Sequence, residues 1–217
     1  HTPTMSRFVR SSKYRHVFGK AEKPENCYNG ISLSRNAWDQ DYIAANTQFF
    51  SVAWESGGGA CAVLKHSQTG KLPQGNVPLV SGHKGAVLDM DWHPFNDFLL
   101  ATVSEDCYGR IWSIPEDGLT ENIEEPVQVL KGHKRKIGTA SFNPVADNIL
   151  ATTSADFAVK IWDIETGDSV LQVDGHGLSV RLEHGAPVGG AAGLEDVEPE
   201  RGREGGQGNG QKQPRHE

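Results

Sequence analysis

The sequence predicts an all-β fold in which about three four-stranded blades form part of a β-propeller, followed by a disordered C-terminal tail. Two observations predict it. In the first, the pairs Gly82-His83 and Gly132-His133 each precede a Ser-x-Asp tripeptide and then a tryptophan, with corresponding residues 50 positions apart. The second is the distribution of aromatic residues, which all lie at or before Trp162 in a chain of 217 residues. The strand-forming part of the chain therefore ends well before its last residue.

The repeat unit itself indicates the type of blade. A repeat of about 40–50 residues that opens with Gly-His and closes with Trp-Asp is typical of a WD-repeat blade. Trp112 and Trp162 each lie 29 positions after the histidine of their repeat, and Asp163 follows the second tryptophan. The sequence therefore predicts a partial WD-repeat β-propeller, with WD-repeat blades at residues 81–130 and 131–173.

Short β-rich runs separated by turn residues place four strands in each of these blades. The strands expected in the first of them cover residues 86–92, 98–103, 109–114 and 127–130. Those expected in the second cover residues 138–142, 149–153, 159–164 and 170–173. A degenerate first blade at residues 31–80 lacks the Gly-His opening, and its expected strands cover residues 31–38, 49–54, 60–64 and 77–80.

The two ends of the chain differ from this blade region in composition. Residues 1–30 form a basic N-terminal arm, with six basic residues and one acidic residue between Arg7 and Lys23. Residues 174–217 form a low-complexity tail without aromatic residues, which cannot bury enough apolar surface to fold. The change follows Gly175-His176, where another blade would open, and indicates an altered reading frame, an unspliced segment or an alternative terminus.

Bulk properties exclude several classes of protein. The formal net charge of −7 argues against a dedicated nucleic-acid-binding protein. Cys27, Cys61 and Cys107 are too few and too far apart for a disulfide framework or a zinc site, so no metal and no cofactor is expected. No apolar run approaches the roughly 18 residues of a membrane span. We therefore expect a cytoplasmic protein with neither a membrane span nor a nucleic-acid partner.

Histidine, serine and aspartate recur together, which is the residue set of a hydrolytic triad. The two sets, each with its tryptophan, are His83, Ser104, Asp106 and Trp112, and His133, Ser154, Asp156 and Trp162. Two identical triads in one small chain would be unusual, whereas a repeat fold requires identical structural networks. We expect a tetrad in which aspartate accepts from histidine, histidine meets serine, and serine reaches the indole N–H. Catalytic residues are therefore not expected, and a Ser/His/Asp hydrolase is the alternative from another class.

Segments outside the repeated pattern narrow the family. They are Ser12–Gly19, Cys27-Tyr28, Glu55–Gly59, Ile114–Thr120 and Gly132–Gly138. In these segments the chain resembles the N-terminal part of the coronins, the actin-binding WD-repeat proteins. The resemblance extends from Ser6 to Val173 without large gaps and implies a truncated form of a longer protein.

The resemblance implies a seven-bladed propeller, a linker and a C-terminal coiled coil. It also implies binding to actin filaments and regulation of the Arp actin-nucleating complex, in the cytoplasm at the actin cytoskeleton of the cell cortex. This chain has about three blades and no coiled-coil pattern, so coiled-coil oligomerisation is not carried over. The function predicted is that of an actin-filament-binding interaction protein involved in organising the actin cytoskeleton, and not that of an enzyme.

The candidates for filament contact are basic residues. They are Arg7, Arg10, Lys13, Arg15, Arg35, Lys134, Arg135 and Lys136. Coronins often have a basic residue directly after the isoleucine of the first strand, but Ser32 follows Ile31 here and the nearest cation is Arg35. Two other readings stay open, a generic WD-repeat scaffold and a truncated, non-functional product, because three blades leave strand edges unpaired.

Overall fold

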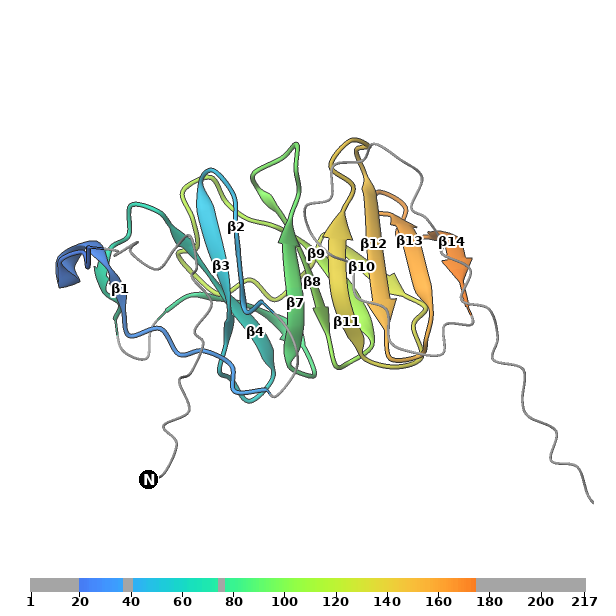
Figure 1. Cartoon of the computed structure of the whole chain (residues 1–217), viewed down its shortest axis with the longest axis horizontal. Helices are drawn as coiled ribbons and strands as arrows, with labels where there is room; N and C mark the ends of the chain where they lie inside the picture. The colour runs from blue at the N-terminus through green and yellow to red at the C-terminus, as the bar shows by residue number, and fades with distance from the viewer. Residues whose placement is uncertain (1–19, 37–40, 74–76, 175–217) are drawn as a thin grey trace, which may run out of the picture. The chain divides into compact units, whose positions relative to one another are not determined.

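The structure is a computed structural model that describes residues 20–36, 41–73 and 77–174. These residues form three four-stranded antiparallel sheets that stand side by side (Figure 1). The first sheet contains β2 (Ile43–Ala45), β3 (Phe49–Trp54), β4 (Gly59–Lys65) and β6 (Leu79–His83). The middle sheet contains β7 (Val87–Trp92), β8 (Leu99–Ser104), β9 (Tyr108–Ser113) and β10 (Gln128–Lys131). The third sheet contains β11 (Ile137–Phe142), β12 (Ile149–Ser154), β13 (Val159–Asp163) and β14 (Ser169–Val173).

A smaller element lies beside the first sheet. A short 3-10 helix, η1 (Pro24–Asn26), leads into β1 (Tyr28–Asn29), which pairs in parallel with β5 (Gly70–Lys71). Tyr28, Ile31 and Val77 pack on a small core of the first sheet that includes Phe50 and Leu64. Parallel pairing between segments about 40 residues apart in sequence is a long-range contact, and the strand pattern did not predict it.

Turn chemistry explains why the consecutive strands fold back as hairpins. The side-chain oxygen of Asn143 accepts from the backbone N–H groups of Val145 and Ala146, both at 2.9 Å, between β11 and β12. Asn46 makes the corresponding bond to Phe49 at 2.7 Å between β2 and β3. Asparagine offers the backbone such a local acceptor, so these positions terminate one strand and begin the next.

Two hydrophobic cores lie between the sheets, and neighbouring residues of β8 serve both. Leu100 belongs to the core between the first and middle sheets, with Trp112. Ala101 belongs to the core between the middle and third sheets, with Trp162. Successive side chains of a strand point to opposite faces, so one strand fills two cores. The two tryptophans, 0% and 1% exposed, are among the largest buried side chains.

Polar side chains also join the sheets across the inner strands. Asp89 and Asp91 of β7 accept from the backbone N–H groups of Ala140 and Phe142 of β11, at 2.9 and 2.7 Å. On the other side, the indole N–H of Trp92 donates to the carbonyl of Ala44 at 3.3 Å. These bonds fix the distance between neighbouring sheets and supplement the apolar contacts.

The predicted all-β fold is confirmed, and the eight strands expected in residues 81–173 are found within one residue of their expected bounds. The first strand of the first sheet was predicted wrongly. Residues 31–36 form no strand, although Leu33 bridges Trp54, and β2 at Ile43–Ala45 pairs with β3 instead. The sequence signal was misleading because the edge of β3 is shared by two short segments. Trp38, most of the basic arm and all but Asp174 of the predicted disordered tail lie outside the described residues.

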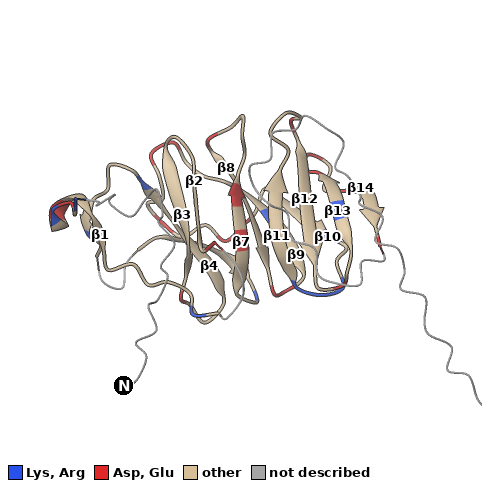
Figure 2. Ribbon diagram, in the orientation of Figure 1, with Lys and Arg blue, Asp and Glu red and all other residues tan. Residues whose placement is uncertain are grey.

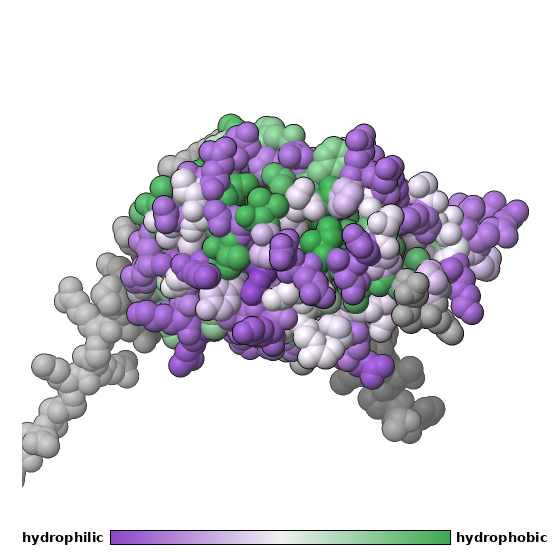
Figure 3. Space-filling view, turned by 180° about the vertical axis from the view of Figure 1, so that it is seen from behind, coloured by the Kyte–Doolittle hydropathy of each residue, from purple (hydrophilic) through white to green (hydrophobic). Residues whose placement is uncertain are grey.

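Apolar residues also remain on the surface. From the rear of the view in Figure 1, hydrophobic residues form small groups that are separated by hydrophilic ones (Figure 3). Val127 and Leu171 are among the exposed apolar side chains, at 65% and 56% exposure. The apolar groups on this face therefore form no continuous surface.

Candidate interaction surface

Five connections meet at one end of the three sheets, the lower end in Figure 1, and we call this end the turn edge. It consists of the hairpin turns at residues 55–58, 105–107 and 155–157 and the inter-sheet loops at residues 84–86 and 132–136. Blue and red segments alternate along it, and a blue stretch lies on the loop below β11 (Figure 2). The turn edge therefore combines charged loops with the ends of the buried strands.

A buried network joins His83, the last residue of β6 in the first sheet, to the middle sheet and anchors the loop at residues 84–86. Nδ1 of His83 lies 3.1 Å from both carboxylate oxygens of Asp106, and Nε2 lies 2.8 Å from Oγ1 of Thr102. The indole N–H of Trp112 donates to the same Oγ1 at 2.8 Å. Because carboxylate only accepts and indole only donates, the histidine donates from Nδ1 and accepts the threonine hydroxyl at Nε2. With a neutral histidine, every side chain of this network therefore has a hydrogen-bond partner.

The third sheet repeats this network 50 positions later. Nδ1 of His133 lies 3.1 Å from Asp156, and Nε2 lies 2.8 Å from Oγ1 of Thr152. The indole N–H of Trp162 donates to Thr152 at 2.8 Å. The aspartate also accepts from the backbone N–H of Lys134 at 2.8 Å, which ties the loop to the turn.

The structure corrects the predicted tetrads at one position each, since Thr102 and Thr152 replace Ser104 and Ser154. Trp112 pairs with Leu100 across β8 and β9, and the diagonal neighbour two residues along is Thr102. A side chain reaches such a diagonal neighbour at about 7–8 Å between Cα atoms, but it does not reach two residues further. The signal was present in the sequence, because Thr102 and Thr152 are also 50 positions apart.

The serines have a different task. Oγ of Ser104 donates to the carbonyl of Gly85 at 2.8 Å and accepts from the N–H of Asp106 at 3.1 Å. Ser154 likewise donates to the carbonyl of Arg135 at 3.0 Å. Each serine therefore fastens a loop of the turn edge to its turn, and neither forms the serine–histidine pair that a nucleophile needs.

Ionisation follows from burial and from these hydrogen bonds. Burial lowers the pKa of His83 and His133, and it outweighs the opposite effect of the neighbouring carboxylates. Burial alone would raise the pKa of Asp106, but hydrogen bonds from His83, Lys84 and Arg110 hold this pKa far below its usual value. The networks therefore contain neutral imidazole and ionised carboxylate at neutral pH.

The cations predicted as contacts lie in different places. Lys134 and Arg135 are exposed on the loop at residues 132–136, and Lys136 is half-buried beside them. Arg35 is exposed next to the first turn, where its backbone N–H donates to the Glu55 carboxylate at 2.8 Å. Arg7, Arg10, Lys13 and Arg15 lie outside the described residues. Lys84, which was not among the predicted contacts, is also an exposed cation of the turn edge and lies at the position that corresponds to Lys134.

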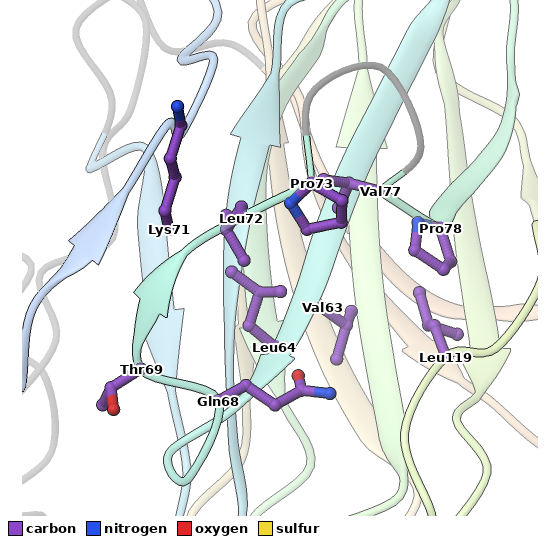
Figure 4. Close-up of a pocket in the computed structure, with 10 residues that line it drawn as sticks. All are labelled: Val63, Leu64, Gln68, Thr69, Lys71, Leu72, Pro73, Val77, Pro78 and Leu119. Carbon is purple, nitrogen blue, oxygen red and sulfur yellow. The ribbon is translucent and has the colours of Figure 1, made fainter. Parts of the chain in front are cut away.

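An apolar cavity of about 350 Å³ lies in the first sheet, away from these cations. Its walls include Leu64, Leu72, Pro73 and Pro78 (Figure 4). The side-chain amide oxygen Oε1 of Gln68 accepts a hydrogen bond from the backbone N–H of Lys65 at 3.0 Å. The described residues around this cavity offer no charged group aimed into it, so it is not a site for polar chemistry.

Among the described residues, no group of three or more histidine, cysteine or acidic side chains is placed to hold a metal ion. In the same part of the chain, no helix has the length and apolar character needed to cross a membrane.

Comparison with known proteins places these features among relatives. Residues 7–71 match a domain of unknown function, DUF1899, and residues 76–113 and 124–163 match the WD domain, G-beta repeat. Coronin-A of Dictyostelium discoideum is 55% identical over 127 residues, which cover 58% of this chain and 28% of the relative. Coronin-like protein crn1 of Schizosaccharomyces pombe is 51% identical over 112 residues, which cover 51% of this chain and 18% of the relative.

A solved structure supports the same assignment. The crystal structure of the WD40 domain from Toxoplasma gondii coronin matches with a TM-score of 0.64 and 32% sequence identity. The match covers 68% of this chain and 38% of that chain. The chain thus spans well under half the length of each of these relatives.

Proposed function

We propose that this chain, which belongs to the coronin family of WD-repeat proteins, binds actin filaments through the turn edge. The observation that supports the proposal most is the run of three cations, Lys134, Arg135 and Lys136, on one loop of that edge. The actin filament is proposed as the anionic partner because the chain resembles coronins, the family to which the matched relatives belong by name. The proposed role is docking, and no reaction is assigned to the histidine networks.

The loop carries its charges on a fixed backbone. Its Lys134 N–H is bound by Asp156, its Arg135 carbonyl by Ser154, and its Lys136 carbonyl by the N–H of Ala155 at 3.0 Å. A loop ordered before binding loses less conformational entropy when it meets its target. The histidine network beneath it therefore contributes to binding by holding the cations in place.

Electrostatics favours an anionic partner for this loop. The carboxylate of Asp156 in the adjoining turn is already engaged by His133 and by the backbone N–H of Lys134. The exposed charges of Lys134 and Arg135 are therefore available to steer encounter with an acidic surface. Such steering weakens as salt screens it, with a Debye length of about 10 Å at 0.1 M.

Ser32 stands where coronins often have a basic residue, and a cation close to it in the fold can take that place. The Ser32 carbonyl accepts from the N–H of Glu55 at 2.9 Å, which brings residues 32–35 to the first turn of the edge. Arg35 then supplies a cation there. We propose that Arg35 and the loop of Lys134 carry the contact, together with Arg7, Arg10, Lys13 and Arg15 of the arm.

The cellular location and a second partner are proposed from the resemblance to coronins. We propose a location in the cytoplasm at the cortical actin cytoskeleton, and the Arp actin-nucleating complex as a second partner. Neither depends on enzymatic turnover.

Co-sedimentation with actin filaments tests the proposal. The double variant Lys134→Ala, Arg135→Ala should weaken binding about fivefold or more at low salt, because two exposed cations contribute to an anionic contact. The difference should shrink at moderate salt. Lys71→Ala is the matched control, since this exposed cation lies on β5, away from the turn edge. Equal pelleting of the chain and the double variant at low salt would contradict the proposal.

A further inference from the structure

Phe157 has a backbone conformation that its side chain disfavours. Its φ is 63°, in the left-handed region where bulky side chains are rare because Cβ approaches the carbonyl oxygen. The turn imposes this conformation, since the Phe157 N–H donates to the Ser154 carbonyl at 3.1 Å. Asparagine or glycine would occupy the position with less strain. A strained residue of this kind is a reason to look for a function.

The phenylalanine ring does not contribute to the core. It is 45% exposed, whereas Trp162 and Phe142 of the same sheet are 1% and 6% exposed. Within the described ranges, its ring stacks on no other aromatic ring. Neither packing nor turn geometry therefore explains why a large apolar side chain stands at this place.

Phe157 belongs to the turn that is bonded to the cationic loop. The turn that carries Phe157 is joined to the loop of Lys134–Lys136 by three hydrogen bonds, which involve Ser154, Ala155 and Asp156. The arrangement places one exposed aromatic side chain among charged ones on a backbone held from both sides. Binding hot spots have this composition, with an aromatic anchor surrounded by polar contacts that exclude water.

We infer that Phe157 is the apolar anchor of the turn edge, which inserts into an apolar depression of the actin filament while the neighbouring cations meet its acidic surface. This inference rests on the proposed function and adds the residue that gives short-range affinity. The cations attract the filament over a distance, and the buried ring slows dissociation.

The middle sheet supplies a matched control. Cys107 lies 50 positions before Phe157 and has a φ of 70°, so its turn has the same strained backbone. Its neighbour Glu105 is exposed and acidic, and the adjoining loop carries Lys84 alone in place of three cations. Replacing Cys107 by asparagine therefore relieves similar strain without removing an aromatic anchor.

The experiment compares three variants of the full chain, Phe157→Asn, Phe157→Tyr and Cys107→Asn, by co-sedimentation with actin filaments at two salt concentrations. We expect Phe157→Asn to weaken binding by about fivefold or more. Its salt dependence should match that of the unaltered chain, because no charge has changed. Phe157→Tyr should retain binding, and Cys107→Asn should bind as the unaltered chain does. The melting temperature of Phe157→Asn should be equal or higher, which excludes unfolding as the cause.

The outcomes are distinguishable. Equal binding of Phe157→Asn and the unaltered chain would overturn the anchor and leave the proposed function intact. Failure of the unaltered chain to pellet with filaments would overturn both. If Phe157→Asn instead abolished self-association in sedimentation equilibrium and left filament binding unchanged, the ring would contact a second copy and the inference would be wrong.

Discussion

The middle and third sheets contain the same network in different surroundings. Both have a histidine bound to aspartate and threonine, with the tryptophan indole on the same hydroxyl and 2.8 Å bonds at equal places. In the middle sheet, Arg110 donates to Asp106 at 2.9 Å and also contacts His83. In the third sheet, the corresponding Lys160 turns toward Gln172 of β14. Each network thus joins a hairpin to the inter-sheet connection that precedes it, and its outer connections vary.

The outer strands differ more strongly. Leu130 of β10 is 1% exposed because the third sheet covers it, whereas Leu171 of β14 is 56% exposed. All five residues of β14 are exposed. The histidine network therefore recurs from one repeat to the next, while burial of an outer strand depends on whether a neighbouring sheet covers it.

The largest expected effect concerns those outer strands. Leu130→Ala should lower the free energy of unfolding by about 2–5 kcal/mol, because it leaves a cavity in a packed core. Leu171→Ala should change it by less than about 0.5 kcal/mol, since the side chain is exposed. Urea denaturation measures both. Equal effects would show that β14 is covered in solution.

The hydroxyl at the centre of each network gives the second effect. Thr102→Val keeps the shape and leaves the imidazole and the indole unpaired, at a cost of about 1–3 kcal/mol for a buried polar group. Thr152→Val should cost a similar amount, because Thr152 and Trp162 are as fully buried as Thr102 and Trp112. Ser104→Ala is the control and should cost about 1 kcal/mol. A larger loss of stability for Ser104→Ala than for Thr102→Val would contradict the assignment of the threonine, rather than the serine, to the network.

The next prediction concerns how the free energy of unfolding depends on pH. His83 and His133 have lowered pKa values in the folded chain, so the unfolded chain binds more protons as the pH falls below about 6.5. Stability should therefore decrease from about pH 7 toward pH 5, by at most about 1.4 kcal/mol per pH unit for each histidine. His83→Gln should reduce this slope in equilibrium unfolding. A slope that stays the same would mean that His83 does not titrate on unfolding.

The smallest effect tests the outer connections. Arg110→Lys should cost about 1 kcal/mol, because lysine cannot reproduce the directed hydrogen bond of the planar guanidinium to the Asp106 carboxylate. Gln172→Ala, which removes the acceptor of Lys160 on the exposed strand, should cost less than about 0.5 kcal/mol. Thermal unfolding of the two variants in parallel would check the order, and a reversed order would contradict the difference between the sheets.

Much of the candidate site could be predicted from the sequence. The 50-residue repeat located His83, Asp106 and Trp112, and the basic residues of the loop at Lys134–Lys136 are among the predicted filament contacts. Thr102 was missed because a strand places it diagonally opposite its tryptophan, which linear spacing does not show. Phe157 was missed because its interest lies in a backbone angle and an exposure.

The sequence by itself determined the all-β fold and the bounds of eight strands, because alternating side chains and repeated motifs are local signals. The tertiary structure alone decided that β2 rather than residues 31–38 begins the first sheet, and that Asp89 and Asp91 bind the next sheet. It also decided which hydroxyl completes each network. These features depend on the register between strands and on the packing of one sheet against the next, and contacts between distant residues leave no periodic trace in the chain.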